Sequence, residues 1–186
     1  MEKKELIRQA AIKVFSEKGY HKATTDRMAE EAGVAVGTIY NYFHNKQDIL
    51  EYIFEVEFDK RKQSFEEIKK ENLHPVEKIS RVIEKHFYEV RDNPRLIKII
   101  LTERPFTRTC PARRAGLRQF MEEIIANGVK EGYFRDVDDE ILAMMLFGII
   151  EYVMDEYLAR EGEPDVDIFE RTQQELIKLL RYGMAR

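Results

Sequence analysis

A short segment near the N-terminus gathers polar side chains at a spacing suited to binding a polar polymer. From Val36 to Tyr42 the sequence VGTIYNY supplies one hydroxyl, one amide and two phenol groups. If this segment is helical, Ile39 and Phe43, four residues apart, face inward and leave the polar groups outside. Amide and hydroxyl groups contact base edges and phosphates. The pattern therefore favours contact with double-stranded DNA.

Two short helices joined by a tight turn are predicted to position this segment. Thr25 can cap the first helix with its hydroxyl, and Gly33 can end it in the left-handed conformation, so the chain reverses within about three residues. The second helix begins at about Val36. This layout is typical of a helix-turn-helix, which places its second helix in the major groove.

The same region resembles the signature of a known family. From Gly33 to Leu50 the sequence reads GVAVGTIYNYFHNKQDIL, which is similar to the core motif of the TetR family of bacterial transcriptional repressors. The segment from Ile7 to Ala32 is similar to the family's first two helices. Ala35 and Val36 depart from the pattern, because many relatives carry a Ser or Thr cap followed by a polar residue. A cap worth roughly 0.5 to 2 kcal/mol is then missing.

The resemblance implies a role for each residue of the helix-turn-helix. Four side chains would hold phosphates, namely Thr25, Tyr40, Tyr42 and Lys46. Four residues would lie nearest the base edges, namely Val36, Gly37, Thr38 and Asn41. In that arrangement Asn41 suits adenine and Val36 suits a thymine methyl group. A homodimer would bind a palindromic operator whose half-sites lie about one helical turn apart.

Composition and charge bound the domain organisation. The 186 residues, 44% of them hydrophobic, fit one large or two small domains. We expect a DNA-binding head over residues 1–46 and a ligand-binding and dimerisation domain over residues 47–186. Residues 1–50 carry 8 basic and 7 acidic side chains, whereas the remainder carries 23 and 28, which together give the net charge of −4. DNA affinity should therefore depend on a few local basic groups and be sensitive to salt.

The spacing of apolar residues and helix breakers predicts an all-α fold of about nine helices. Gly19 is predicted to end the first helix and Asn45 to begin a long fourth one. The longest nearly apolar run, Ile141 to Ile150, is about half the length that a bilayer requires. The N-terminus has no apolar signal region, and a single cysteine, Cys110, fits a reducing compartment. A cytoplasmic protein without membrane contact is expected.

An oligomer interface is predicted in the last third of the chain. From Ile141 to Leu158 the sequence is apolar on nearly every side, so a helix there must bury more than one face. With the last helix it would form a four-helix interface between two subunits. The interface residues are predicted to be Ile150, Met154, Leu176 and Leu180. The alternative is that both helices complete a monomeric core.

A cluster of arginines predicts a site for an anionic effector. Five arginines and no acidic residue lie from Arg104 to Arg118. Arg104 and Arg108 would hold the charged group beside an apolar pocket. The pocket would be formed by Phe87, Leu101, Phe120, Met121, Met144 and Phe147. Among TetR relatives this combination is most similar to the branch that senses fatty acyl-CoA. The alternative is a solvated connector whose arginines pair with nearby glutamates.

Catalytic and metal-binding motifs are not found in the sequence. The four histidines are scattered, and neither a zinc-protease motif nor a Gly-rich phosphate loop occurs. His86 and Glu89, three residues apart, could share a metal, but no second copy of the pair exists. We therefore expect no enzyme activity and no cofactor. The expected protein is a repressor that an effector releases from DNA; the alternatives are a constitutive DNA-binding protein and a helical enzyme or metal carrier.

Overall fold

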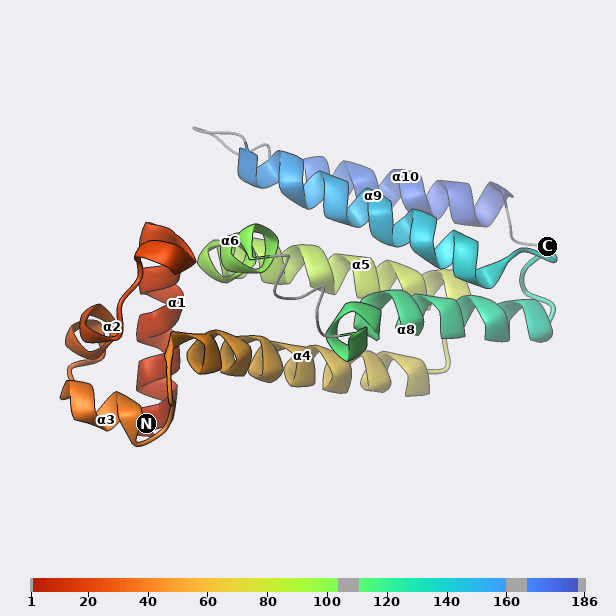
Figure 1. The fold of residues 1–186 in the computed structure, drawn as a ribbon. Helices are drawn as coiled ribbons and strands as arrows, with labels where there is room; N and C mark the ends of the chain where they lie inside the picture. Colours follow the sequence, from red (N-terminus) through yellow and green to blue (C-terminus); the bar gives the residue numbers. More distant parts are fainter. Residues whose placement is uncertain (1, 104–110, 160–166, 184–186) are drawn as a thin grey trace. The chain divides into compact units, whose positions relative to one another are not determined.

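The structure is a computed structural model that describes residues 2–103, 111–159 and 167–183 (Figure 1). Within these residues the protein forms nine helices and no strand, which confirms the all-α fold. The helices are α1 (Lys3–Lys22), α2 (Thr25–Ala32), α3 (Val36–Tyr40), α4 (Lys46–Lys70), α5 (Pro75–Asp92), α6 (Pro94–Thr102), α8 (Pro111–Lys130), α9 (Asp139–Ala159) and α10 (Asp167–Gly183).

The chain divides into two compact units. The first unit comprises Met1–Lys60 and Asn93–Thr109, and the second comprises Arg61–Asp92 and Cys110–Arg186. The first unit is therefore larger than the head expected over residues 1–46. It includes the beginning of α4 and all of α6, because both helices contribute side chains to the same apolar core.

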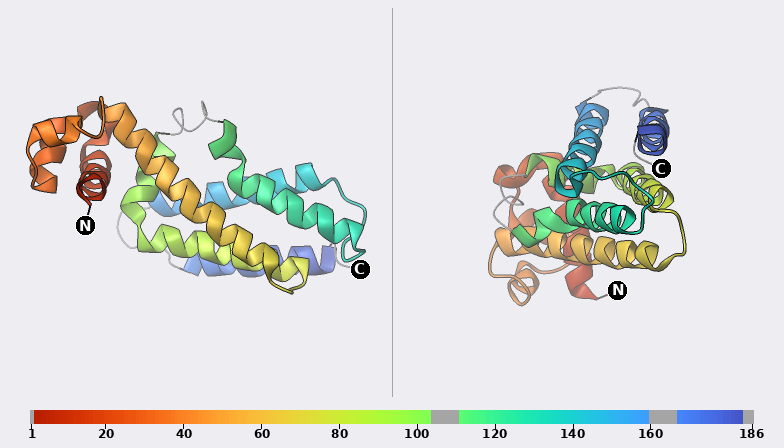
Figure 2. Two further views of the ribbon diagram at one scale, coloured as in Figure 1. Left: turned by 90° about the horizontal axis from the view of Figure 1, so that it is seen from below. Right: turned by 90° about the vertical axis from the view of Figure 1, so that its right-hand side faces the viewer.

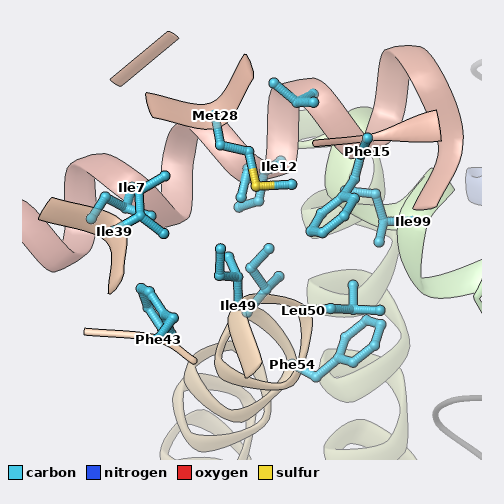
Figure 3. Close-up of a cluster of buried hydrophobic side chains, with 14 of the residues drawn as sticks. Ile7, Ile12, Phe15, Met28, Ile39, Phe43, Ile49, Leu50, Phe54 and Ile99 are labelled. Carbon is cyan, nitrogen blue, oxygen red and sulfur yellow. The ribbon is translucent and has the colours of Figure 1, made fainter. Parts of the chain in front are cut away.

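This core fixes the helices of the first unit (Figure 3). Phe15 of α1, Met28 of α2, Ile39 of α3, Leu50 of α4 and Ile99 of α6 are all buried in it. Ile39 and the nearby Phe43 occupy the inward positions that their spacing predicts. Burying a side chain of this size contributes about 1.5 to 3 kcal/mol, so the core holds α3 firmly although that helix is only one turn long.

Backbone conformation and caps form the turns around α3. Gly33 follows α2 with φ 66°, in the left-handed region that Gly enters without steric penalty, as expected. Gly19, with φ 72°, kinks α1 rather than ending it, and the helix resumes as far as Lys22. Asn45 caps α4 as predicted, because its Oδ1 accepts hydrogen bonds from the backbone N–H groups of Gln47 (2.8 Å) and Asp48 (3.0 Å).

The second unit is a bundle in which α9 packs on α8 and α10, and α10 packs on α5 (Figure 2). Its aromatic side chains form contacts between helices, of which two join α5 to α10 and α4 to α8. Phe87 stacks on Phe169 with ring centres 4.6 Å apart, and Phe65 lies against Phe120 at 4.8 Å. In the part of the chain that the structure describes, no helix is both long and apolar enough to cross a membrane.

Candidate nucleic-acid interface and effector region

The outer residues of α3 and the turn after it are accessible. Tyr40 is 53% exposed and Tyr42 44% exposed. Gly37 and Asn41 are also exposed, and Val36 and Thr38 are partly exposed. The α3 surface, which we define as Val36, Gly37, Thr38, Tyr40, Asn41 and Tyr42, can therefore be reached by a duplex. Ala35 occupies the N-cap position of α3 without a side-chain hydrogen bond, as the sequence predicts.

The cap of α2 lies one residue earlier than predicted. Thr24, not Thr25, is the N-cap, and its hydroxyl oxygen accepts a hydrogen bond from the backbone N–H of Arg27 at 3.3 Å. The Thr25 hydroxyl is instead hydrogen-bonded to the Tyr40 hydroxyl, with 3.1 Å between the oxygens. Two hydroxyls that the family resemblance assigns to phosphates thus lie side by side, one from α2 and one from α3.

The ammonium group of Lys46, for which the resemblance implies a phosphate contact, is hydrogen-bonded within the protein in the absence of DNA. Its Nζ donates hydrogen bonds to the carbonyl oxygens of Tyr20 (2.8 Å), His21 (3.1 Å) and Ala23 (3.2 Å) at the end of α1. An ammonium group has three protons, and these bonds use all of them. The ammonium also lies 4.6 Å from the centre of the Tyr20 ring. The phosphate contact stays a prediction, and without DNA the Lys46 ammonium stabilises the carbonyl end of a helix.

The buried Arg8 forms ion pairs with two partly buried glutamates, which the sequence pattern did not indicate. Its guanidinium donates hydrogen bonds to Glu5 on α1 at 2.7 and 2.8 Å, and to Glu57 on α4 at 2.8 Å. The hydrogen bonds with Glu5 are the largest cause of a raised pKa for Arg8 and a lowered pKa for Glu5. In the sequence, the available sign of these ion pairs was that Arg8 directly follows Ile7, an apolar residue that the structure buries. The Arg8 side chain joins α1 to the first part of α4.

Asn41→Ala tests the base contact proposed for the α3 surface. Loss of a bidentate amide contact with adenine should reduce discrimination at one operator position by about 1 to 3 kcal/mol. The slope of affinity against salt should stay unchanged, because the amide is uncharged. Binding to a library of operator variants measures both quantities. Unchanged discrimination at every position would show that Asn41 contacts no base edge.

The residues predicted to line an effector pocket do not share one environment. Phe87, Phe120 and Met121 are buried in the second unit. Phe147 is partly exposed, and Met144 on α9 is 46% exposed, so the shared apolar pocket stays a prediction. Leu101 lies in α6, but its side chain, like Arg104 and Arg108, lies outside the described residues.

One arginine of the cluster has an acidic partner, as the connector alternative expects. Arg118 of α8 donates a hydrogen bond to Glu140 of α9 at 3.4 Å. Arg113 and Arg114 lie in α8, but their side chains lie outside the described residues. The cluster is therefore not uniformly free for an anionic ligand, and Arg104 and Arg108 remain the predicted anchors.

The four residues predicted to form the subunit interface are buried inside one subunit. Ile150 is fully buried, and Met154, Leu176 and Leu180 are nearly so. Their assignment to an interface is wrong, because side chains already covered by their own subunit leave no surface for a partner. The large apolar side chains exposed on the same two helices are Ile141, Met144, Met145, Ile149 and Tyr152 of α9 and Leu179 and Tyr182 of α10. We refer to these seven as the α9–α10 apolar surface.

His86 of α5 is buried and neutral. Its Nε2 lies 2.9 Å from the Met154 sulfur, while burial, and to a lesser degree the charge of Arg61, lowers its pKa to about 3. Glu89 pairs with Arg61 at 3.3 Å rather than joining His86. Across residues 2–103, 111–159 and 167–183, no group of three or more His, Cys, Asp or Glu side chains is placed to hold a metal ion.

Known proteins match this chain over both of its parts. The family model described as bacterial regulatory proteins of the tetR family matches residues 7–53, and the model of the tetracyclin repressor-like C-terminal domain matches residues 72–159. The fatty acid metabolism regulator protein of Bacillus subtilis (strain 168) is 29% identical over 179 residues, which cover 92% of this chain and 91% of the relative.

Two solved structures of fatty acid regulators are similar along nearly their whole length. The fatty acid degradation regulator FadR from Bacillus halodurans aligns with a TM-score of 0.84 and 26% identity, covering 95% of each chain. FadR from Bacillus subtilis, solved in complex with stearoyl-CoA, aligns with a TM-score of 0.83 and 28% identity, covering 96% of this chain and 98% of that one. With its helix-turn-helix and its C-terminal helical domain both matched, this chain belongs to the TetR family of bacterial transcriptional regulators.

Proposed function

We propose that the protein is a homodimeric repressor that binds a palindromic operator and is released from it by a long-chain acyl-CoA. The observation that carries the proposal is the similarity, over 96% of the chain, to a regulator solved with stearoyl-CoA. The accessible α3 surface and the α9–α10 apolar surface support its other two parts, DNA binding and dimerisation.

DNA binding is assigned to the α3 surface, with the Thr25 and Tyr40 hydroxyls on one phosphate and Asn41 on a base edge. The 3.1 Å distance between these hydroxyls allows a single phosphate group to contact both. A head that fills one major groove binds weakly, whereas two heads on a two-fold axis read two half-sites. The operator is therefore a palindrome.

Dimerisation is assigned to the α9–α10 apolar surface. Its seven large apolar side chains are each at least 39% exposed in the single subunit, and they lie on two helices that pack together. Large apolar side chains gathered in exposed positions on neighbouring helices favour an interaction site. Two copies of the surface, related by a two-fold axis, bury each other and form a four-helix interface.

Release of the protein from its operator is assigned to a displacement of α4 or α6, the two helices through which effector binding in the second unit can act on the first unit. Helix α4 belongs to the first unit up to Lys60 and to the second unit beyond it. Helix α6 places Leu96 and Ile99 in the core of the first unit and is joined to α5 of the second unit through Asn93 alone. An effector that binds better when either helix is displaced therefore favours heads whose spacing does not match the operator.

The acyl-CoA proposal predicts a dependence on chain length. Each buried methylene contributes about 0.8 kcal/mol, so extending the chain by four carbons should lower the concentration needed for release by roughly two orders of magnitude until the pocket is full. Titration of an acyl-CoA series against a fixed mixture of protein and operator measures this concentration. Arg104→Ala and Arg108→Ala should raise it without changing the DNA affinity of the unliganded protein.

One control and two contrary outcomes make the titration decisive. Free CoA carries the charged group without the chain and should release little protein. If no acyl-CoA changes operator affinity, the protein is a constitutive DNA-binding protein rather than an effector-responsive one. A response that does not depend on chain length would instead show that the acyl chain is not buried.

A further inference from the structure

His86 leaves one buried polar atom without a partner inside the second unit. The residue is 5% exposed, and among the described residues no atom forms a hydrogen bond with its Nδ1. Its neighbour Phe87 packs against Phe169 of α10, and its other ring nitrogen lies beside Met154 of α9. Because buried polar groups are nearly always hydrogen-bonded, an unpaired atom in such a place points to a ligand.

The contact with Met154 determines which kind of group can bind Nδ1. A thioether sulfur has no proton and can only accept, so the Nε2 that lies 2.9 Å from it carries the imidazole proton. A neutral imidazole has one such proton, which leaves Nδ1 as an acceptor. The lowered pKa keeps the ring neutral at physiological pH, so it carries only one such proton. The missing partner must therefore be a hydrogen-bond donor.

We propose that His86 recognises the effector by accepting, at Nδ1, a hydrogen bond from an O–H or N–H group on the part of the effector that enters the second unit. This inference rests on the proposed acyl-CoA response. An acyl-CoA offers such donors in two places: the amide groups of the pantetheine arm, and a hydroxyl on the acyl chain where the chain is hydroxylated. A molecule without a donor leaves Nδ1 unpaired, so the site discriminates by chemistry as well as by length.

Nitrogen NMR of protein labelled in its four histidines tests the contact directly. Three probes are compared: stearate, which carries no donor as a carboxylate, stearoyl-CoA, and stearoyl-CoA hydroxylated on its chain. In the free protein, the Nδ1 resonance of His86 should be that of an unprotonated nitrogen without a hydrogen bond. Stearate should leave it there. A shift with both CoA esters assigns the donor to the pantetheine arm, and a shift with the hydroxylated ester alone assigns it to the chain.

Paired substitutions give an independent measurement. His86→Phe keeps a ring of similar size but removes the acceptor, whereas His86→Asn keeps an acceptor near the position of Nδ1. Loss of one hydrogen bond should raise the acyl-CoA concentration needed for release by about three- to tenfold in His86→Phe, and by less in His86→Asn. Met154→Leu keeps Nδ1 but removes the sulfur that holds the imidazole proton on Nε2, so it should also raise this concentration, by no more than His86→Phe does. All three variants should bind the operator normally without ligand.

Different results would overturn the role of His86 and the proposed response to acyl-CoA. If acyl-CoA releases the operator but the Nδ1 resonance does not move, His86 is not a contact, although the effector assignment stands. The same holds if Nδ1 is protonated or already hydrogen-bonded in the free protein. If no acyl-CoA binds or releases DNA, both proposals are overturned together.

Discussion

Lys46→Met is expected to destabilise the first unit by about 2 kcal/mol and, through that loss, to weaken operator binding. A hydrogen bond from a charged donor contributes about 1.5 to 3 kcal/mol, but Lys46 is partly exposed, so water replaces some of the three bonds that its ammonium makes. Methionine keeps much of the apolar stem and removes the charge. The carbonyl groups of Tyr20, His21 and Ala23 then lose their partner, and the start of α4 is no longer held to the end of α1.

Two measurements separate this role from the phosphate contact that the family resemblance implies. Denaturant unfolding reports the stability, and operator affinity over a range of salt concentrations reports the number of phosphates neutralised. We expect a less stable protein whose salt slope equals that of the parent. Lys18→Met, at an exposed position on α1, should change neither the stability nor the slope. If the stability were unchanged and the salt slope were flatter by about one per subunit, Lys46 would be a phosphate contact.

Local features of the first unit could be predicted from the sequence. The left-handed Gly33, the Asn45 cap and the inward positions of Ile39 and Phe43 each depend on residues within a few positions of one another. The cap of α2 was misplaced by one residue because Thr24 and Thr25 are chemically equal candidates. Only the folded backbone shows which hydroxyl reaches the N–H of Arg27.

Contacts between distant residues could not be predicted in the same way. Lys46 reaches carbonyl groups up to 26 positions away, and Arg8 reaches Glu57 across 49 positions. Neither partner is marked by spacing, because the contact depends on how α1 and α4 pack. A lysine after a helix-turn-helix looks the same in sequence whether it binds a phosphate or a backbone carbonyl, so the resemblance alone does not decide between the two roles.

Helix α9 has a second feature that could not be predicted from the sequence. Its apolar residues form two stripes that both follow helical spacing: Ala143, Leu146, Ile150 and Val153 are buried, whereas Ile141, Met145, Ile149 and Tyr152 are exposed. The sequence correctly indicated more than one apolar face. It could not indicate which stripe covers the interior of its own subunit, because the two have similar hydrophobicity. The predicted interface was therefore assigned to the buried stripe.

Substitutions at adjacent residues, one on each stripe, are expected to affect different properties, namely folding and dimerisation. Ile150→Asp places a carboxylate where the native side chain is fully buried, and it should destabilise the second unit by roughly 4 kcal/mol or more, since an apolar contact is lost and a charge is buried without a partner. That is a large share of the 5 to 15 kcal/mol by which a typical domain is stable. We expect unfolded or insoluble protein.

Ile149→Asp places the same carboxylate where the native side chain is 39% exposed, so the fold should be retained. Across a two-fold axis each interface receives two carboxylates, which must be desolvated for the subunits to associate. The expected product is a folded monomer that binds a single half-site weakly and has lost cooperative operator binding. Thermal unfolding, sedimentation velocity and operator titration measure the three properties. A stable dimer with normal cooperativity would place the interface away from α9, and unfolding as severe as that of Ile150→Asp would show that both stripes belong to the core of one subunit.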